Sequence, residues 1–162
     1  MSVLRLDLGF CCKISFLLET CAARGVGYRI VMGDIGLAAQ ARLFCQGRKA
    51  KALRGRVAVL RSWNAPMLAL LLEETGTLPG SIITDSLPGY SWHNWGLAVD
   101  LEGPEYATLR VVAREQGLTT GRDWGAPGHV QARPYSAGAG LTPRLIEAEM
   151  RKIHGAYPLC PS

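Results

Sequence analysis

Two histidines and one aspartate stand at positions that suit a metal site. His93 lies seven positions before Asp100, and His129 follows in the run from Pro127 to Gln131. Asp100 comes directly after Gly-Leu-Ala-Val, so its carboxylate is expected to be at least half buried. Buried carboxylates are rare unless they are paired or bound to metal. Two imidazoles and one carboxylate can hold a catalytic zinc ion, which polarises a carbonyl and lowers the pKa of a water molecule.

The spacing also allows simpler interpretations of the same residues. His93 and His129 could be hydrogen-bonded histidines of the core or surface, and Asp100 could cap a helix or pair with an arginine. The third histidine, His154, comes just before Gly155 at the end of a predicted helix. We expect it to be solvated or to place a favourable charge at the helix C-terminus.

The elements around these residues must bring them together. A histidine and an aspartate seven positions apart cannot be adjacent on one straight strand. They converge if His93 lies in a loop that enters a strand at 96–101 and Asp100 lies near the end of that strand. We expect further strands at 28–32, 81–84 and 129–132, and helices at 10–24, 37–46, 51–75 with a break at 64–66, 104–116 and 142–154. This irregular alternation predicts an α+β fold, with a small central antiparallel sheet flanked by helices and a single metal site.

The composition indicates one globular domain, residues 1–162. The net charge of +5 suits a polyanionic partner, but the basic residues are spread out. We therefore expect no nucleic-acid partner, and interpret the densest basic stretch, 48–56, as a solvated helix face or loop. The five cysteines are odd in number and contain no CxxC pair, which argues against a disulfide framework and favours a reducing compartment. Cys11 and Cys12 are expected to be small core residues.

The run from Ser91 to Asp100 fits the pattern SxHxxGxAxD. It resembles the signature of zinc peptidases related to D-Ala-D-Ala carboxypeptidases and L-alanyl-D-glutamate endopeptidases, which include many phage endolysins; the zinc domain of hedgehog proteins belongs to the wider superfamily. The resemblance covers about residues 10–132. It implies that His93, Asp100 and His129 are zinc ligands. It further implies that Ser91 binds substrate or orients a ligand beside the metal, and that Gln40 supports the wall of the active site.

Two positions depart from the family pattern. The family usually has an acidic general base three positions before the last histidine, where this chain has Ala126, and an arginine where this chain has Ile35. Losing a general base typically lowers the rate by about 10² to 10⁴. Asp123 is the nearby carboxylate that could replace the missing base through a rearranged loop.

The resemblance implies a zinc metallopeptidase that cleaves an amide bond in peptidoglycan stem peptides, as a carboxypeptidase or an endopeptidase similar to an endolysin. The alternative is a non-catalytic, metal-holding module that binds cell-wall peptide or a protein partner. The sequence has no clear signal peptide and no apolar run long enough to span a bilayer. We therefore expect a protein without a stable membrane anchor, cytoplasmic until it is released to the cell wall. Separately, we expect a monomer.

Overall fold

The computed structural model describes residues 6–155. Its Cα positions separate into two compact units. Unit 1 comprises Met1–Ile35 and Trp95–Ser136, and unit 2 comprises Gly36–Asn94 and Ala137–Ser162. Each unit therefore combines two segments that are distant in the sequence.

Unit 1 is built on a four-stranded antiparallel sheet with the strand order β1-β2-β4-β3. The strands are β1 (Arg29–Met32), β2 (Ala98–Glu102), β3 (Thr119–Gly121) and β4 (Ala126–Gln131). β2 and β4 take the two inner positions, so each is paired on both edges. The small antiparallel sheet and the helices confirm the predicted α+β class.

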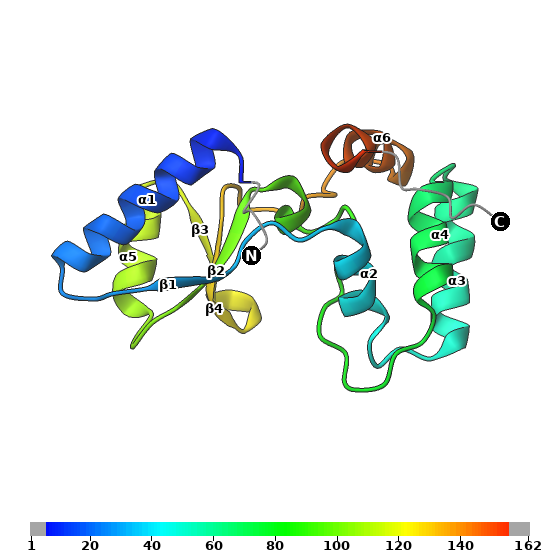
Figure 1. Ribbon diagram of the computed structural model, residues 1–162, viewed down its shortest axis with the longest axis horizontal. Helices are drawn as coiled ribbons and strands as arrows, with labels where there is room; N and C mark the ends of the chain where they lie inside the picture. Colours follow the sequence, from blue (N-terminus) through cyan, green and yellow to red (C-terminus); the bar gives the residue numbers. More distant parts are fainter. Residues whose placement is uncertain (1–5, 156–162) are drawn as a thin grey trace. The chain divides into compact units, whose positions relative to one another are not determined.

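One face of this sheet carries the hydrophobic core of unit 1. Side chains alternate between the two faces of a strand, and Val99, Leu101 and Val130 are the members of β2 and β4 that join the core. Helices α1 (Leu8–Ala23) and α5 (Ala107–Glu115) pack against each other and complete this core beside the sheet (Figure 1). The helical core residues are Phe10, Ile14, Leu17 and Cys21 in α1, and Leu109, Val112 and Ala113 in α5. The alternation leaves Asp100 and His129 on the opposite face of the sheet.

The described part of unit 2 is helical. Its elements are α2 (Leu37–Cys45), α3 (Ala50–Ser62), α4 (Pro66–Thr75) and α6 (Pro143–His154), and its first segment ends in the short 3-10 helix η1 (Trp92–Trp95). The expected break between α3 and α4 is confirmed, with Pro66 as the first residue of α4. The sequence Thr142-Pro143 also predicts the cap of the last helix, and this cap is confirmed, because the Thr142 side chain accepts a hydrogen bond from the Leu145 amide.

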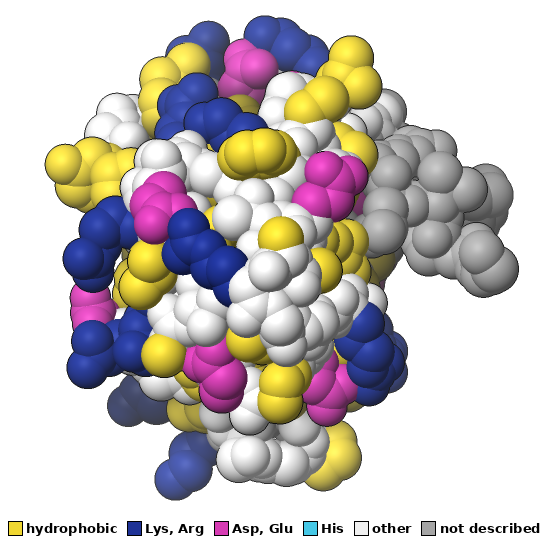
Figure 2. All heavy atoms as spheres, turned by 90° about the vertical axis from the view of Figure 1, so that its left-hand side faces the viewer, with side chains coloured by type: hydrophobic (Ala, Val, Ile, Leu, Met, Phe, Trp, Pro, Cys, Tyr) yellow, Lys and Arg dark blue, Asp and Glu magenta, His cyan; other side chains and the backbone are white. Residues whose placement is uncertain are grey.

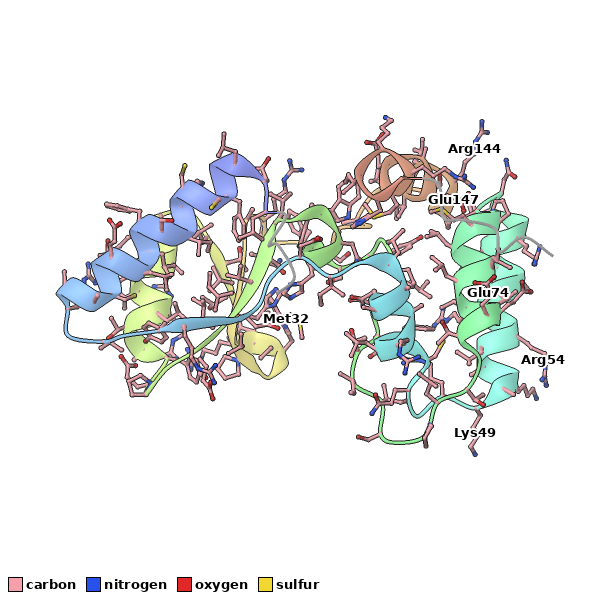
Figure 3. The ribbon with its side chains drawn as sticks, viewed as in Figure 1. Met32, Lys49, Arg54, Glu74, Arg144 and Glu147 are labelled. Carbon is pink, nitrogen blue, oxygen red and sulfur yellow. The ribbon has the colours of Figure 1, made fainter. Side chains whose placement is uncertain are left out.

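A buried carboxylate joins two helices of unit 2. Glu147 in α6 is 5% exposed and points to the N-terminal end of α4 (Figure 3). Its Oε2 accepts hydrogen bonds from the amides of Met67 (2.8 Å) and Leu68 (3.1 Å), and its other oxygen pairs with Arg151. The first amides of a helix have no partner within the helix, and the N-cap Ala65 offers no side-chain acceptor. Glu147 therefore caps α4 from another helix.

Several predicted boundaries differ from the structure. The strand expected at 81–84 does not form, and Ile82 and Ile83 there are more than half exposed. Helix α5 begins at Ala107 instead of residue 104, because the Glu105 carboxylate accepts a hydrogen bond from the Thr108 amide and caps the helix. β4 begins at Ala126 instead of residue 129, and β3 was not predicted.

Two predictions about helix faces were wrong. Cys11 and Cys12 are exposed on α1, not buried in the core. The sequence of the last helix predicts an apolar side formed by Leu145, Ile146, Met150 and Ile153. In α6, Ile146 and Met150 are buried as predicted, but Leu145 (50% exposed) and Ile153 (42% exposed) are not.

The surface shows no concentration of one charge on the face drawn in Figure 2. Lys and Arg side chains alternate there with Asp, Glu and hydrophobic side chains, and no histidine is visible. Within residues 6–155, no helix combines the length and the hydropathy that a transmembrane segment requires.

Candidate metal centre

Asp100 and His129 are direct partners on the two inner strands of unit 1. They are opposite residues in the antiparallel pairing of β2 with β4, and their side chains share the face away from the core. The Oδ1 atom of Asp100 lies 2.8 Å from the Nδ1 atom of His129. The His129 side chain is 13% exposed and the Asp100 side chain 32% exposed, so a small ligand can reach the pair from solvent.

His93 is presented by the turn that leads into β2. It is 6% exposed and lies in η1, the loop position that the sequence predicts. The turn is held by the fully buried Asn94, whose Oδ1 accepts a hydrogen bond from the Gly89 amide at 2.9 Å. The carbonyl of Asn94 lies 2.6 Å from Nε2 of His154, so His154 is a hydrogen-bonding partner of this turn and not a solvated terminal residue.

The three predicted ligands form a group that can hold a metal ion. One ligand atom each of His93, Asp100 and His129 lies within 4.8 Å of the other two. The side chains thus provide two imidazoles and one carboxylate, a donor set that fits zinc. Two ligand atoms about 2.1 Å from a tetrahedral zinc ion lie roughly 3.4 Å apart. The Asp100–His129 pair, at 2.8 Å, is close to this separation and needs only a small opening.

Gln131 completes the hydrogen bonding of the His129 ring. It lies two residues further along β4, on the same face, and its Oε1 is 2.9 Å from Nε2 of His129. The Nε2 atom of Gln131 donates to the carbonyls of Arg133 and Tyr135. The sequence analysis assigned no role to Gln131, although its spacing from His129 in a predicted strand places both residues on one face.

A bulge brings Ala126 close to His129. β3 pairs Thr120 with Val130 but Gly121 with Ala126, so residues 127–129 are skipped in the ladder. A Cβ atom on Gly121 would lie 2.4 Å from the Ala126 carbonyl oxygen and 2.8 Å from Cβ of His129. Only glycine fits at this point, and position 126 is therefore next to the third ligand.

The residues that could supply or replace a general base lie around this bulge. Ala126 is half-buried and has no proton acceptor in its side chain. Asp123 is exposed in the 3-10 helix η2 (Arg122–Trp124), and the neighbouring Trp124 ring meets the His129 ring edge-on at 6.0 Å between centroids. Ile35, at the position of the family arginine, is buried at 8% exposure.

Gln40 and Ser91 have defined structural contacts in unit 2. Gln40 is 2% exposed, and its Nε2 donates to the Ser86 carbonyl at 2.9 Å, which ties α2 to the loop before η1. The carbonyl of Ser91 accepts a hydrogen bond from the amide of Asn94, at the start of η1. The predicted contacts of both residues with substrate stay predictions.

Comparison with known proteins gives similarity to solved structures but no family match. No family model matches this sequence, and no curated protein matches it. The chain is similar to a vancomycin resistance D,D-pentapeptidase, VanY from a VanB-type resistance cassette, whose crystal structure is of a mutant in complex with Zn(II). The TM-score is 0.47 and the sequence identity 18%, over 87% of this chain and 83% of that chain.

Proposed function

We propose that this protein is a zinc-dependent peptidase that cleaves an amide bond in peptidoglycan stem peptides. The observation that carries the proposal is the convergence of His93, Asp100 and His129, with ligand atoms within 4.8 Å, at the motif that resembles the zinc peptidases. A bound zinc ion would polarise the substrate carbonyl and acidify a water molecule.

The chain's own residues would hold the metal and position the substrate. His93, Asp100 and His129 supply three ligands, which leaves a fourth position for water or substrate. Ser91 would contact substrate beside the metal, and Gln40 would support the wall of the site through its bond to the Ser86 carbonyl. The net charge of +5 favours association with an anionic cell wall.

Peptide hydrolysis also requires a residue that accepts a proton from the attacking water. Ala126 cannot accept a proton, so we propose Asp123 as the base. The support is that Asp123 lies in η2, whose Trp124 ring meets His129 edge-on. We further propose that the protein acts as a monomer, in the manner of an endolysin, on a wall that it reaches from the cytoplasm.

Hydrolysis of purified sacculi tests the proposal. Protein loaded with one equivalent of zinc should release new amino groups, and mass spectrometry of the fragments should identify the cleaved bond. Asp100→Ala should bind less zinc and release none. A zinc-loaded protein that releases no amines above the Asp100→Ala control would refute the peptidase activity.

A second candidate is a non-catalytic module that keeps the metal and binds cell-wall peptide or a protein partner. The observation that favours it is Ala126, which stands beside His129 and has no acceptor. Pull-down of zinc-loaded protein with sacculi, without release of amines, would support this module. Loss of that binding in Asp100→Ala would show that the metal site is part of the binding surface.

A further inference from the structure

We propose that Gln131 is a positioning residue that holds the His129 imidazole with its proton on Nε2 and thereby directs Nδ1 to the metal. The inference rests on the metal-binding part of the proposed function and not on peptidase activity. Gln131 is a buried polar residue, at 7% exposure, and the proposal explains the hydrogen bonds that its side chain makes.

The orientation of the Gln131 amide is decided by its neighbours. Its Nε2 faces the carbonyl oxygens of Arg133 and Tyr135, and a carbonyl can only accept. The amide nitrogen must therefore point to these carbonyls, and Oε1 must point to His129. An exchange of the two amide atoms would bring three acceptors together and is excluded by the same contacts.

The orientation of Gln131 then decides the tautomer of His129. Because Oε1 is an acceptor at 2.9 Å, Nε2 of His129 has to carry a proton. In a neutral imidazole the other nitrogen, Nδ1, then has a free lone pair. This is the tautomer in which Nδ1 can bind a metal ion.

Asp100 would be the neighbouring ligand of the same metal ion. Its Oδ1 lies 2.8 Å from Nδ1 of His129, so a metal ion bound by Nδ1 would also be within reach of the carboxylate. By holding Nε2, Gln131 thus turns toward Asp100 the nitrogen that would bind the metal.

The backbone makes this arrangement rigid. Gln131 pairs with Ala98 of β2 on one side and with Thr119 of β3 on the other. Hydrogen bonds between buried groups are strengthened by the low local dielectric, and partners of metal-bound histidines orient the ring in this way in other metal sites. The His129 ring is therefore oriented before metal arrives.

The first test is zinc affinity, measured by competition with a chromophoric chelator. Gln131→Leu removes the acceptor at similar size and should weaken zinc binding by about 10- to 100-fold. Thr119→Val alters the cross-strand neighbour of Gln131 and should leave the affinity unchanged. Unchanged affinity in a folded Gln131→Leu would overturn the inference.

The second test reads the tautomer in the unsubstituted protein and does not depend on a variant. Long-range ¹H–¹⁵N spectra of the His129 ring should show a proton on Nε2 both without and with zinc, and zinc on Nδ1. An unprotonated Nε2, or zinc on Nε2, would overturn the inference. Zinc binding without hydrolysis would remove only the peptidase proposal, whereas absence of zinc binding would remove both.

Discussion

Asp100 and His129 face one another across β2 and β4, with Oδ1 of Asp100 2.8 Å from Nδ1 of His129. The two atoms are held by strands that are paired on both edges, so their separation does not depend on the position of a loop. We expect His129→Ala to weaken zinc binding by more than the roughly 10- to 100-fold that loss of a supporting residue causes. Metal analysis after dialysis checks this.

His154→Gln is the matched control for that substitution. It changes a histidine outside the group while keeping a donor for the Asn94 carbonyl. The zinc content should stay at that of the unsubstituted protein. An equal loss in both variants would show that the effect comes from general disturbance of the structure.

Introducing an acidic side chain at position 126 should raise the rate of hydrolysis. The backbone of Ala126 and the Cβ atom of His129 both lie beside Gly121, so an aspartate at position 126 would be close to the third candidate ligand. We expect Ala126→Asp to increase the rate of amine release from sacculi by about 10²-fold or more, as general bases do. Zinc affinity should change little, which separates this effect from metal loading.

Asp123→Asn tests the alternative base. If Asp123 accepts the proton, the residual rate should fall by about 10² to 10⁴ while zinc content stays constant. Asp85→Asn is the control, because Asp85 is an exposed carboxylate of unit 2 that pairs with Arg48. Equal rates in both variants would show that Asp123 is not the base.

The glycine before His129 should be intolerant of any side chain. A Cβ atom on Gly128 would lie 2.1 Å from the Leu101 carbonyl oxygen, so β4 would have to move away from β2. We expect Gly128→Ala to destabilise the protein by about 1–3 kcal/mol and to weaken zinc binding. Gly27→Ala, where a Cβ meets nothing within 4 Å, should do neither. Denaturant titration and chelator competition measure the two effects.

The cap that Glu147 provides for α4 should be measurable as stability. Glu147→Ala leaves the amides of Met67 and Leu68 buried without their acceptor, which should lower the free energy of unfolding by about 1–3 kcal/mol. Glu149→Ala removes an exposed carboxylate of the same helix that pairs with Lys152. This control should stay within about 0.5 kcal/mol of the unsubstituted protein.

The cysteines should differ in reactivity and in their effect on alkaline stability. Burial raises the pKa of the Cys21 and Cys45 thiols above the ordinary value of 9.0, whereas Cys11 and Cys12 are exposed. Iodoacetamide at pH 8 should label Cys11 and Cys12 in the folded protein, and Cys21 and Cys45 only after unfolding. Peptide mapping by mass spectrometry distinguishes the four sites.

The raised pKa values of Cys21 and Cys45 determine the direction in which stability changes with pH. Above pH 9 the unfolded chain loses protons from Cys21 and Cys45 before the folded protein does, so stability falls as the pH rises. Denaturant titrations at pH 8 and pH 10 should show this fall. It should be smaller in a Cys21→Ala variant, provided that the variant folds.

Patterns that are local in sequence predicted much of the fold. The spacing of Phe10, Ile14, Leu17, Leu18 and Cys21 predicts one apolar side of the first helix; in α1 all of them are buried in the core except Leu18, which is partly buried against it. The same periodicity places Cys11 and Cys12 on other sides of the helix. The prediction that they are buried relied on the apolar composition of the run and ignored this periodicity. The motif placed His93 in a turn and Asp100 in a strand, as the structure has them.

Contacts between distant segments could not be predicted. The amides of Met67 and Leu68 are capped by a glutamate about eighty residues away, and no local pattern indicates this. On α6 the charged Glu147 is buried while Leu145 and Ile153 are exposed, which is the reverse of what hydrophobicity alone predicts. The bulge in β4 and the hydrogen bond from His129 to Gln131 depend likewise on how the strands pair.

The skipped residues of β4 separate a fixed part of the strand from a short loop. Val130 and Gln131 stay in register with Thr120 and Thr119, so the part of β4 that follows His129 is fixed to the sheet. The residues from Arg122 to Gly125 lie outside this register, between Gly121 and Ala126. A change in the length or composition of this short segment therefore need not move Asp100 and His129 relative to each other.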